Sequence, residues 1–513
     1  MGLLKNSALA ALFAIVGRAF RDSWIAGALS RFLNHDGLVI SKVSESRLND
    51  FAVKVFDIIP GLVRGFYVRH SGLCDTSLTV RFLRAYGEAE YAAVSWLAAA
   101  VLLLPESRWK TMYPLIGFGL LILLHWVLLG LNPASYTPGK RKLTNGWALL
   151  FAVSCVISVV FSYNPKVSLE MLPRYVSCLM ALYLFTSIEW TAEKLRRVVD
   201  FIIVCMILLS LYGIYQRFSG LTVRRSEVDI ARNPYITARI FSLYDNANAF
   251  GFLLCLLLPL SFISAIYGPE LRFFGSRLVS RRVISAAAFV IGSAALILTY
   301  SRGAWIAFAA GLFFFAALKK PKLIPIFIVL ILVALPFIPN SVFFRLLTIF
   351  TGDTSLQTRT DIWSAVLKIF IRSPVYGAGL GLENSANYVI NNGLFQPKIR
   401  NYYIHAHNFA FQVVAEMGII GVISFFGMAF SILKKALRKT NNPLIAGCSM
   451  SLISIFVCGI GDHPISYPRM MLVFWIFLGI TVAAGQYTCN NPQKKVPQVS
   501  SGGRKRNIKA AEV

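Results

Sequence analysis

The chain has 513 residues, of which 56% are apolar and only 14% are charged, and its mean hydropathy is +0.63. These values exclude a soluble globular protein of this size, which would need far more polar surface. The formal net charge of +28 indicates cytoplasmic loops rich in Lys and Arg. Nucleic-acid binding is not expected, because no basic segment interleaved with aromatic residues stands on a soluble module.

The first 88 residues are predicted to form a cytoplasmic or interfacial extension. Leu9–Phe32 is apolar but interrupted by charged residues, a pattern typical of a basic amphipathic helix lying on the inner leaflet. Phe51–Tyr67 is a second segment of this kind. A disordered cytoplasmic arm is the alternative interpretation.

Repeated apolar runs then predict an all-α polytopic membrane protein in the lipid bilayer. About 12 runs are long enough to cross a hydrocarbon core of about 30 Å. They are 89–105, 112–131, 145–162, 171–188, 198–216, 244–267, 283–300, 303–318, 322–338, 408–432, 444–462 and 469–486. We therefore expect a transmembrane domain over residues 89–486, with one large extracytoplasmic loop at 339–407. Residues 487–513 are expected to form a basic, disordered cytoplasmic tail.

The charges of the loops predict the orientation. With both termini in the cytoplasm, alternate loops should carry the Lys and Arg residues. They do, at 140–142, 194–197, 272–282, 319–322 and 434–439. The loop Arg217–Ser242 departs from the rule, because it has five arginines and is predicted to lie outside. Arginines in a predicted outer loop depart from the orientation rule and are therefore candidates for a functional role at the outer face.

Three unusual residues are predicted to meet at this outer face. Arg239 precedes the sixth run, Arg302 lies in the turn before the eighth, and His407 begins the tenth. A single arginine there is explained equally well by snorkelling to the interface. Two guanidinium groups beside a histidine, however, are the groups that would hold a phosphate or diphosphate next to a base.

The segment that begins with His405 and His407 carries further polar residues. Asn408 is expected to cap the helix or to bind a ligand, and Glu416 is expected to be a hydrogen-bonded structural link within the bundle. Gly418 follows His407 by three helical turns, so both should face the same side of a regular helix. A glycine there would let a neighbouring helix approach closely.

The long outer loop has its own pattern. Residues 358–371 are amphipathic and predict a helix on the outer interface, which Pro374 ends. The stretch Asn384–Tyr403 is polar and aromatic, a composition suited to contact with sugars or to an ordinary exposed loop.

At these residues the chain resembles the O-antigen ligase and polymerase-like integral membrane glycosyltransferases. The resemblance covers about residues 145–486. It rests on Arg239-x3-Leu243 followed by Asn246 and Asn248, on Ser301-Arg302-Gly303-Ala304, and on Arg359, Trp363, Pro374 and Gly377-x-Gly379 leading to His407-x10-Gly418. The long N-terminal extension departs from the family pattern.

The resemblance implies a GT-C-like bundle in the bacterial cytoplasmic (inner) membrane and an inverting, metal-independent transfer without a cofactor. A glycan would move from undecaprenyl diphosphate to the hydroxyl of an acceptor glycan, lipid or protein. Arg239 and Arg302 would bind the diphosphate, and His407 would activate the acceptor. Asn408, Arg359 and His405 are the supporting candidates.

Two alternatives remain at this point. A repeat-unit polymerase shares the scaffold, although His rather than Arg before the x10-Gly spacing favours a ligase. A lipid-linked glycan transporter or flippase would show polar residues within the bundle and internal repeats. Few charges lie within the predicted spans, and no repeat is apparent.

Overall fold

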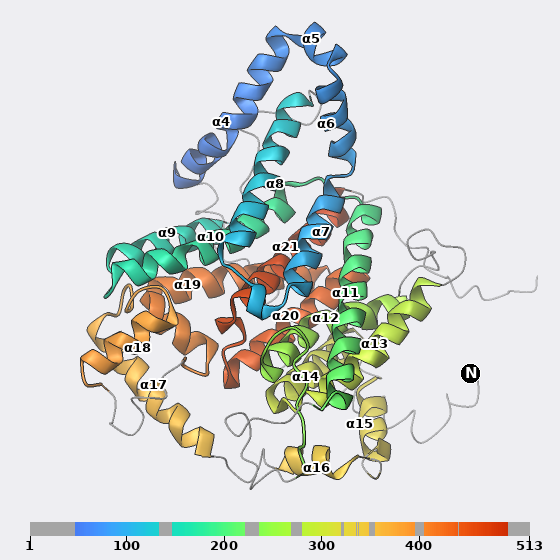
Figure 1. Ribbon diagram of the computed structural model, residues 1–513, viewed down its shortest axis with the longest axis vertical. Coiled ribbons are helices and arrows are strands. Elements are labelled where there is room, and N and C mark those ends of the chain that lie inside the picture. Colours follow the sequence, from blue (N-terminus) through green and yellow to red (C-terminus); the bar gives the residue numbers. More distant parts are fainter. Residues whose placement is uncertain are drawn as a thin grey trace, which may run out of the picture.

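The computed structural model describes residues 47–132, 146–220, 235–267, 280–319, 323–334, 336, 338–347, 354–394, 405–439 and 441–490. The predicted inner-leaflet helix Leu9–Phe32, residues 395–404 of the outer loop and most of the basic tail lie outside these ranges. In the described part all the regular elements are helices (Figure 1), which confirms an all-α protein.

The helices follow one another through short connections. The N-terminal group is α4 (Arg47–Arg69), α5 (Ser71–Thr76), α6 (Leu78–Glu88), α7 (Glu90–Leu103) and α8 (Met112–Leu131). The middle group is α9 (Gly146–Val160), α10 (Pro165–Ser187), α11 (Ala192–Phe218), α12 (Ala247–Tyr267), α13 (Arg281–Leu298), α14 (Arg302–Lys319) and α15 (Leu323–Ala334). The last group is α16 (Asn340–Leu347), α17 (Thr354–Arg372), α18 (Leu382–Asn391), α19 (Phe409–Arg438), α20 (Pro443–Gly461) and α21 (Pro468–Asn490).

Eight described helices are long and apolar enough to cross a membrane, namely α8, α10, α11, α12, α13, α19, α20 and α21. Helices α7, α9 and α14 are apolar but shorter, and α15 has 12 residues. Each of the predicted spans coincides with one of these helices. The protein is therefore a polytopic membrane protein, and the number of spans beyond eight stays a prediction.

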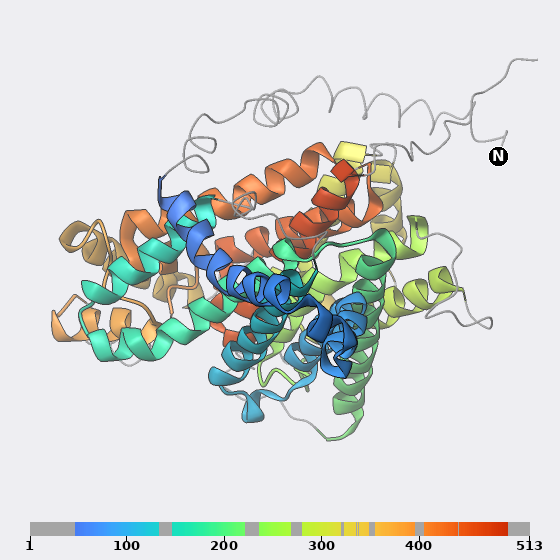
Figure 2. The same ribbon diagram turned by 90° about the horizontal axis from the view of Figure 1, so that it is seen from above.

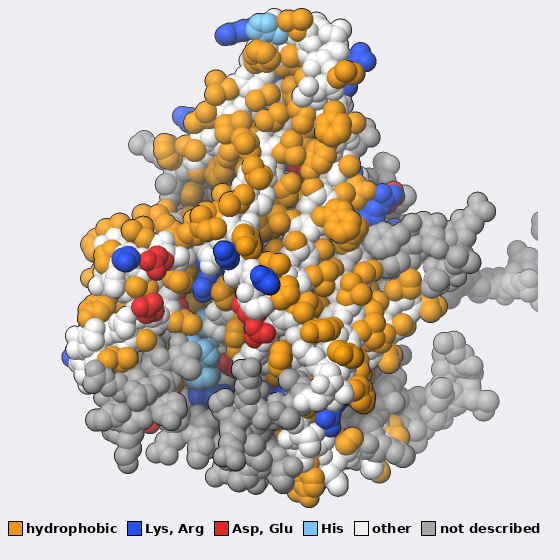
Figure 3. All heavy atoms as spheres, in the orientation of Figure 1, with side chains coloured by type: hydrophobic (Ala, Val, Ile, Leu, Met, Phe, Trp, Pro, Cys, Tyr) orange, Lys and Arg blue, Asp and Glu red, His pale blue; other side chains and the backbone are white. Residues whose placement is uncertain are grey.

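Helices α12 and α21 form the centre of the bundle. In each, 83% of the most apolar window is buried inside the protein. The sequence of α12 is apolar on all sides, which suits a helix that is surrounded by others. Gly251 of α12 allows α14 to pack closely against α12. A Cβ at this position would lie only 3.0 Å from the Cβ of Ala304. The face of the bundle seen in Figure 3 is mainly hydrophobic, as expected of a surface facing lipid.

Helices α4–α6 extend from one end of the molecule beside α8 (Figure 1). Helix α4 confirms that Phe51–Tyr67 is helical. It packs on α8 where Gly130 leaves room, since a Cβ there would lie 2.6 Å from Val63. Leu62 and Phe66 on its outer side are 70% and 60% exposed. Its position on the inner leaflet stays a prediction.

The amphipathic segment of the outer loop is the helix α17, but its apolar face does not lie on a free interface. Ile362, Val366 and Ile369 are fully buried in a small core that also contains residues of α18 and α19. Both views place α9 and α10 beside this α17–α19 region (Figure 1, Figure 2). The amphipathic pattern therefore correctly predicted a helix. Part of its apolar face packs on protein, whereas Leu367 and Ile371 are 49% and 76% exposed, and its position on the outer interface stays a prediction.

Helix α19 is broken at Gly418, so the expectation of a regular helix from His407 to Gly418 is wrong. Gly418 has φ 59° and ψ −156°, and His407 itself has φ 47° and lies before the helix. The neighbour that approaches Gly418 is the turn at residues 374–378, not a helix. The N–H of Ile419 donates to the Pro374 carbonyl at 2.9 Å, and the N–H of Ala378 donates to the Ala415 carbonyl at 2.7 Å.

Candidate functional site

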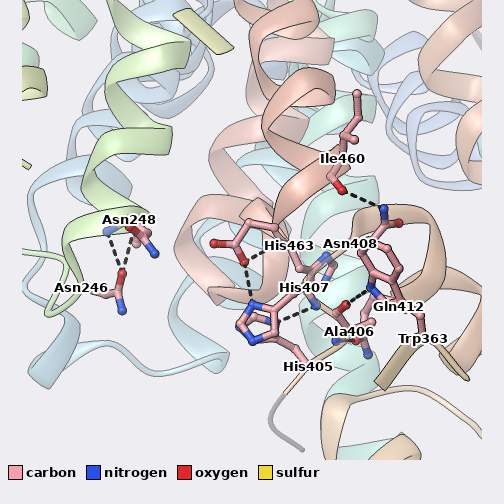
Figure 4. Close-up of polar contacts among 12 residues, drawn as sticks. Asn246, Asn248, Trp363, His405, Ala406, His407, Asn408, Gln412, Ile460 and His463 are labelled. Carbon is pink, nitrogen blue, oxygen red and sulfur yellow. Dashed lines mark hydrogen bonds and ion pairs between the residues drawn. The ribbon is translucent and has the colours of Figure 1, made fainter. Parts of the chain in front are cut away.

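The candidate site lies where α19 begins and α20 ends (Figure 4). Asn408 caps α19, because its Oδ1 accepts from the N–H of Phe411 at 3.0 Å. Its Nδ2 donates to the carbonyl of Ile460 at 2.9 Å, which ties the start of α19 to the last turn of α20. The capping role predicted for Asn408 is thus confirmed, and the same side chain holds the two helix ends together.

The segment between the two histidines is fixed from both sides. The indole N–H of Trp363 in α17 donates to the carbonyl of Ala406 at 2.8 Å, and the N–H of Ala406 donates to Gln412 Oε1 at 2.8 Å. Gln412 in turn donates to Glu416 Oε1 at 2.7 Å. These contacts hold the backbone of His407 in its left-handed conformation.

Glu416 has the structural role that we expected. Its carboxylate accepts from the hydroxyl of Tyr175 at 2.5 Å and from the N–H of Gly381 at 2.9 Å, in addition to Gln412. It joins α10, α19 and the start of α18, and through Gln412 it also supports the histidine segment. Although Glu416 lies two turns into α19, it is therefore connected to the site by hydrogen bonds through Gln412.

Asp462, which follows α20, is the principal residue that the sequence interpretation missed. His407 Nδ1 lies 3.3 Å from Asp462 Oδ1. Burial alone would raise the pKa of Asp462, but the hydrogen bond with His407 and the nearby histidine charges outweigh it and lower the pKa to about 2. An ionised Asp462 accepts from Nδ1–H, which leaves Nε2 as the basic nitrogen of His407. The signal was an Asp-His-Pro sequence directly after an apolar run.

Two more histidines surround this pair. The N–H of His407 donates to His405 Nδ1 at 3.2 Å, and the two rings are 4.0 Å apart. Burial, reinforced by His407, lowers the pKa of His405 to about 4. Burial likewise lowers the pKa of His463 to about 3. His405 therefore belongs to the site as a neutral neighbour of His407.

His405, His407 and Asp462 could share a cation. Each offers one ligand atom, and these atoms lie within 4.8 Å of one another. The donor set of two imidazoles and a carboxylate suits a transition metal. The lone pair of His405 Nδ1 already accepts a hydrogen bond from the backbone N–H of His407.

Arg239 lies in the interior at the same end of the bundle and is 5% exposed. Its Nε donates to the carbonyl of Thr299 at 2.8 Å, and its Nη2 donates to Asn248 Oδ1 at 2.7 Å. Asn246 in turn accepts from the N–H of Asn248 at 2.8 Å. The structure thus joins Arg239 to the asparagines of the first motif. Asn246 and Asn248 lie at the start of α12 (Figure 4).

Arg302 is the first residue of α14 and follows Thr299 by three positions. Its side chain is half-buried. Its neighbour Gly303 accepts from Cys458 Sγ, near the end of α20, at 3.9 Å. Arg359 of α17 approaches the other side, because its Nη1 would lie 3.9 Å from a Cβ on Gly461. Arg359 also helps to lower the pKa of His405. The start of α14, which carries Arg302, and the side chain of Arg359 therefore approach the end of α20 from two separate segments.

Arg469 is a second residue that the sequence interpretation missed. It is fully buried at the start of α21, and its guanidinium lies 3.6 Å from the centre of the Tyr244 ring. Its Nη2 donates to the carbonyl of Leu243 at 2.9 Å, and its Nε is 3.3 Å from Glu106. Arg469 thus anchors the connection that carries Arg239, although nothing in its local sequence separates it from a snorkelling arginine.

Part of the chain is similar to known proteins in sequence. Residues 287–426 match the O-antigen ligase family. A Rickettsia conorii protein named "Putative polysaccharide ligase RC0486" is 29% identical over 133 residues, which are 25% of this chain and 30% of that protein. The family match contains Arg302, Arg359, His405 and His407, whereas Arg239 and Asp462 lie outside it. Over residues 287–426 the chain is therefore similar to the O-antigen ligase family.

Proposed function

We propose that the protein is a glycosyltransferase of cell-surface polysaccharide assembly. It moves a glycan from an undecaprenyl-diphosphate donor to an acceptor hydroxyl at the outer face of the bacterial cytoplasmic membrane. The observation that carries the proposal is the contact between His407 and Asp462 at one end of an apolar bundle. The similarity of residues 287–426 to the O-antigen ligase family supports a role of the ligase or polymerase type.

His407 activates the acceptor in this proposal. Its Nε2 takes the proton from the acceptor hydroxyl while the oxygen attacks the anomeric carbon of the donor sugar. Asp462 holds the ring through Nδ1 and stabilises the positive charge that the imidazole gains. The neutral His405 and His463 add no competing positive charge beside it at neutral pH.

Arg239 and Arg302 bind the leaving group. The bond between the anomeric carbon and the diphosphate oxygen breaks as the new bond forms on the opposite face, which inverts the configuration. Guanidinium groups compensate the negative charge that the diphosphate gains. Asn248 and the Thr299 carbonyl fix the direction of the Arg239 side chain.

We expect the transfer to be independent of a metal. Membranes treated with EDTA should keep their full transfer activity, because His407 acts as a base through a free Nε2. The measurement is transfer of glycan to acceptor before and after chelation. Activity that disappears with EDTA and returns with a divalent cation would show that the three neighbouring ligands bind a catalytic metal instead.

The function is tested by deletion of the gene and complementation with His407→Ala, Arg239→Ala and Arg302→Ala, with the lipid-linked glycan pool as the readout. All three should fail to complement at normal protein levels. Full complementation by all three would refute the site. Long chains that accumulate on the lipid carrier indicate a ligase, whereas single repeat units indicate a polymerase.

A further inference from the structure

A cavity of about 800 Å³ lies at the far end of α19 from the histidine site. Helix α19 begins beside His407 and has 30 residues, and its last turn lines this cavity. The connection between α10 and α11 and the end of α21 form the other walls. We refer to this space as the inner cavity, because it faces the cytoplasm in the predicted orientation. Its volume is within the range of about 300–1,000 Å³ that ligand sites occupy.

The inner cavity carries an excess of positive charge. Lys194, Lys435 and Lys439 line it, and Glu189 is the only acidic residue among its described lining residues. Lys439 Nζ donates to the carbonyl of Gly485 at 3.0 Å, which fixes that ammonium group on the wall. Helix α11 begins here, capped by Thr191, so the positive end of its dipole adds to the potential.

One part of the remaining wall is apolar and consists of Ile188, Trp190, Ile432, Ala436, Val482 and Ala483. Uncharged polar residues, namely Thr186, Ser187, Thr191, Thr481 and Gln486, complete the lining. Trp190 is held rigidly, because its ring stacks on Phe185 and its N–H donates to the Phe185 carbonyl at 2.7 Å. A group of ammonium ions beside an apolar surface at a helix end matches a molecule that has an anionic head and a hydrocarbon chain.

We propose that the inner cavity binds an anionic phospholipid of the inner leaflet. Its phosphate lies among the ammonium groups of Lys194, Lys435 and Lys439, and one acyl chain lies along the apolar wall. Basic pockets between helices on the cytoplasmic side recognise lipid phosphates in this manner. The site is separate from the proposed transfer site and does not depend on it.

The test measures binding of phosphatidylglycerol to the purified full-length protein in detergent, by native mass spectrometry and by the shift in thermal unfolding midpoint. Phosphatidylcholine with the same chains, glycerol phosphate and inorganic phosphate are the comparison probes. The variant is Lys194→Gln with Lys435→Gln. The matched control is Lys110→Gln with Lys166→Gln, two exposed lysines that do not line the cavity.

The wild type and the control should bind phosphatidylglycerol equally, and the variant should bind about 25-fold more weakly, at about fivefold for each lysine. Equal binding by the variant, or equal binding of phosphatidylcholine by the wild type, would overturn the proposal. Free phosphate or glycerol phosphate bound as tightly as the lipid would overturn its lipid part. Lys435→Glu, at an exposed position, repeats the test if the double variant does not fold.

Discussion

At the scale of single residues, His407 and Asp462 act as a pair although they are 55 positions apart in the chain. His407 is fixed through its backbone by the neighbouring Ala406 and by the cap at Asn408. Asp462 is fixed because its Oδ1 also accepts from the N–H of His463 at 2.8 Å. The fold therefore orients the pair in the way that the proposed proton transfer requires.

Asp462→Asn should lower glycan transfer about 100-fold or more. The asparagine oxygen can still accept from the His463 N–H, but a neutral amide cannot stabilise the cation that forms on His407. The measurement is initial transfer rate in membranes at matched protein levels. Asp361→Asn, on α17, is the control and should keep its rate. A rate within about twofold of wild type for Asp462→Asn would remove Asp462 from the mechanism.

The histidines predict how stability depends on pH. In the unfolded chain a histidine binds its proton near pH 6.5, whereas in the folded protein the pKa of His405 is about 4 and that of His463 about 3. The unfolded state therefore binds more protons than the folded state below pH 6.5. The contribution of the two histidines to the free energy of unfolding is complete above pH 6.5 and is lost as the pH falls toward 4. Each histidine should lower the free energy of unfolding by about 1.4 kcal/mol for each pH unit in that window.

The thermal unfolding midpoint in detergent should accordingly fall between pH 7 and pH 5. His463→Asn, which has no proton to gain, should show a shallower fall. Equal slopes for the wild type and this variant would contradict the assignment of His463 as a buried neutral group.

At the scale of elements, the break in α19 positions the site. The interruption at Gly418 lets the segment Pro374–Gly379 insert its backbone into the helix, through the hydrogen bonds to Ala415 and Glu416. The N–H of Gly379 donates to the Glu416 carbonyl at 3.1 Å. This junction connects the outer helices α17 and α18 to the bundle, so Trp363 and Arg359 reach the histidine segment from a fixed base.

Gly418→Ala should destabilise the protein by about 3 kcal/mol or more, because its backbone conformation is open almost only to glycine. An added Cβ would also lie 2.5 Å from the Val375 carbonyl. The measurement is the thermal unfolding midpoint. Gly65→Ala in α4 is the matched control: no atom lies within 4 Å of its new Cβ, so it should leave stability unchanged or raise it slightly. A wild-type midpoint for Gly418→Ala would show that the junction can rearrange.

At the scale of the whole molecule, the two ends of the bundle differ in chemistry. One end gathers histidines, an ionised aspartate and arginines from distant segments. The other end carries the lysines of the inner cavity. The positive-inside rule assigns the first end to the outside and the second to the cytoplasm.

This orientation is tested by labelling single introduced cysteines with a maleimide that cannot cross membranes. Asn391→Cys in α18 should be labelled in intact spheroplasts, whereas Asn441→Cys, between α19 and α20, should be labelled only after permeabilisation. The seven native cysteines whose side chains the structure describes are buried, and labelling of the unsubstituted protein measures the background. The reverse labelling pattern would invert the topology and exclude an outer-face transferase.

The sequence by itself determined the class of the protein, the helical segments and the order of the motifs. Hydropathy and helix caps are local properties, so α12 and the cap at Asn408 could be predicted from neighbouring residues alone. The sequence also identified Arg239, Arg302 and His407 as candidate site residues. The tertiary structure decided which partners surround these residues. Asp462, Arg469 and the burial of the α17 face depend on contacts between helices that are distant in the chain. The break at Gly418 depends on a segment that packs against it. A single sequence does not encode these contacts in its local pattern, because an apolar face can be buried equally well by lipid or by protein.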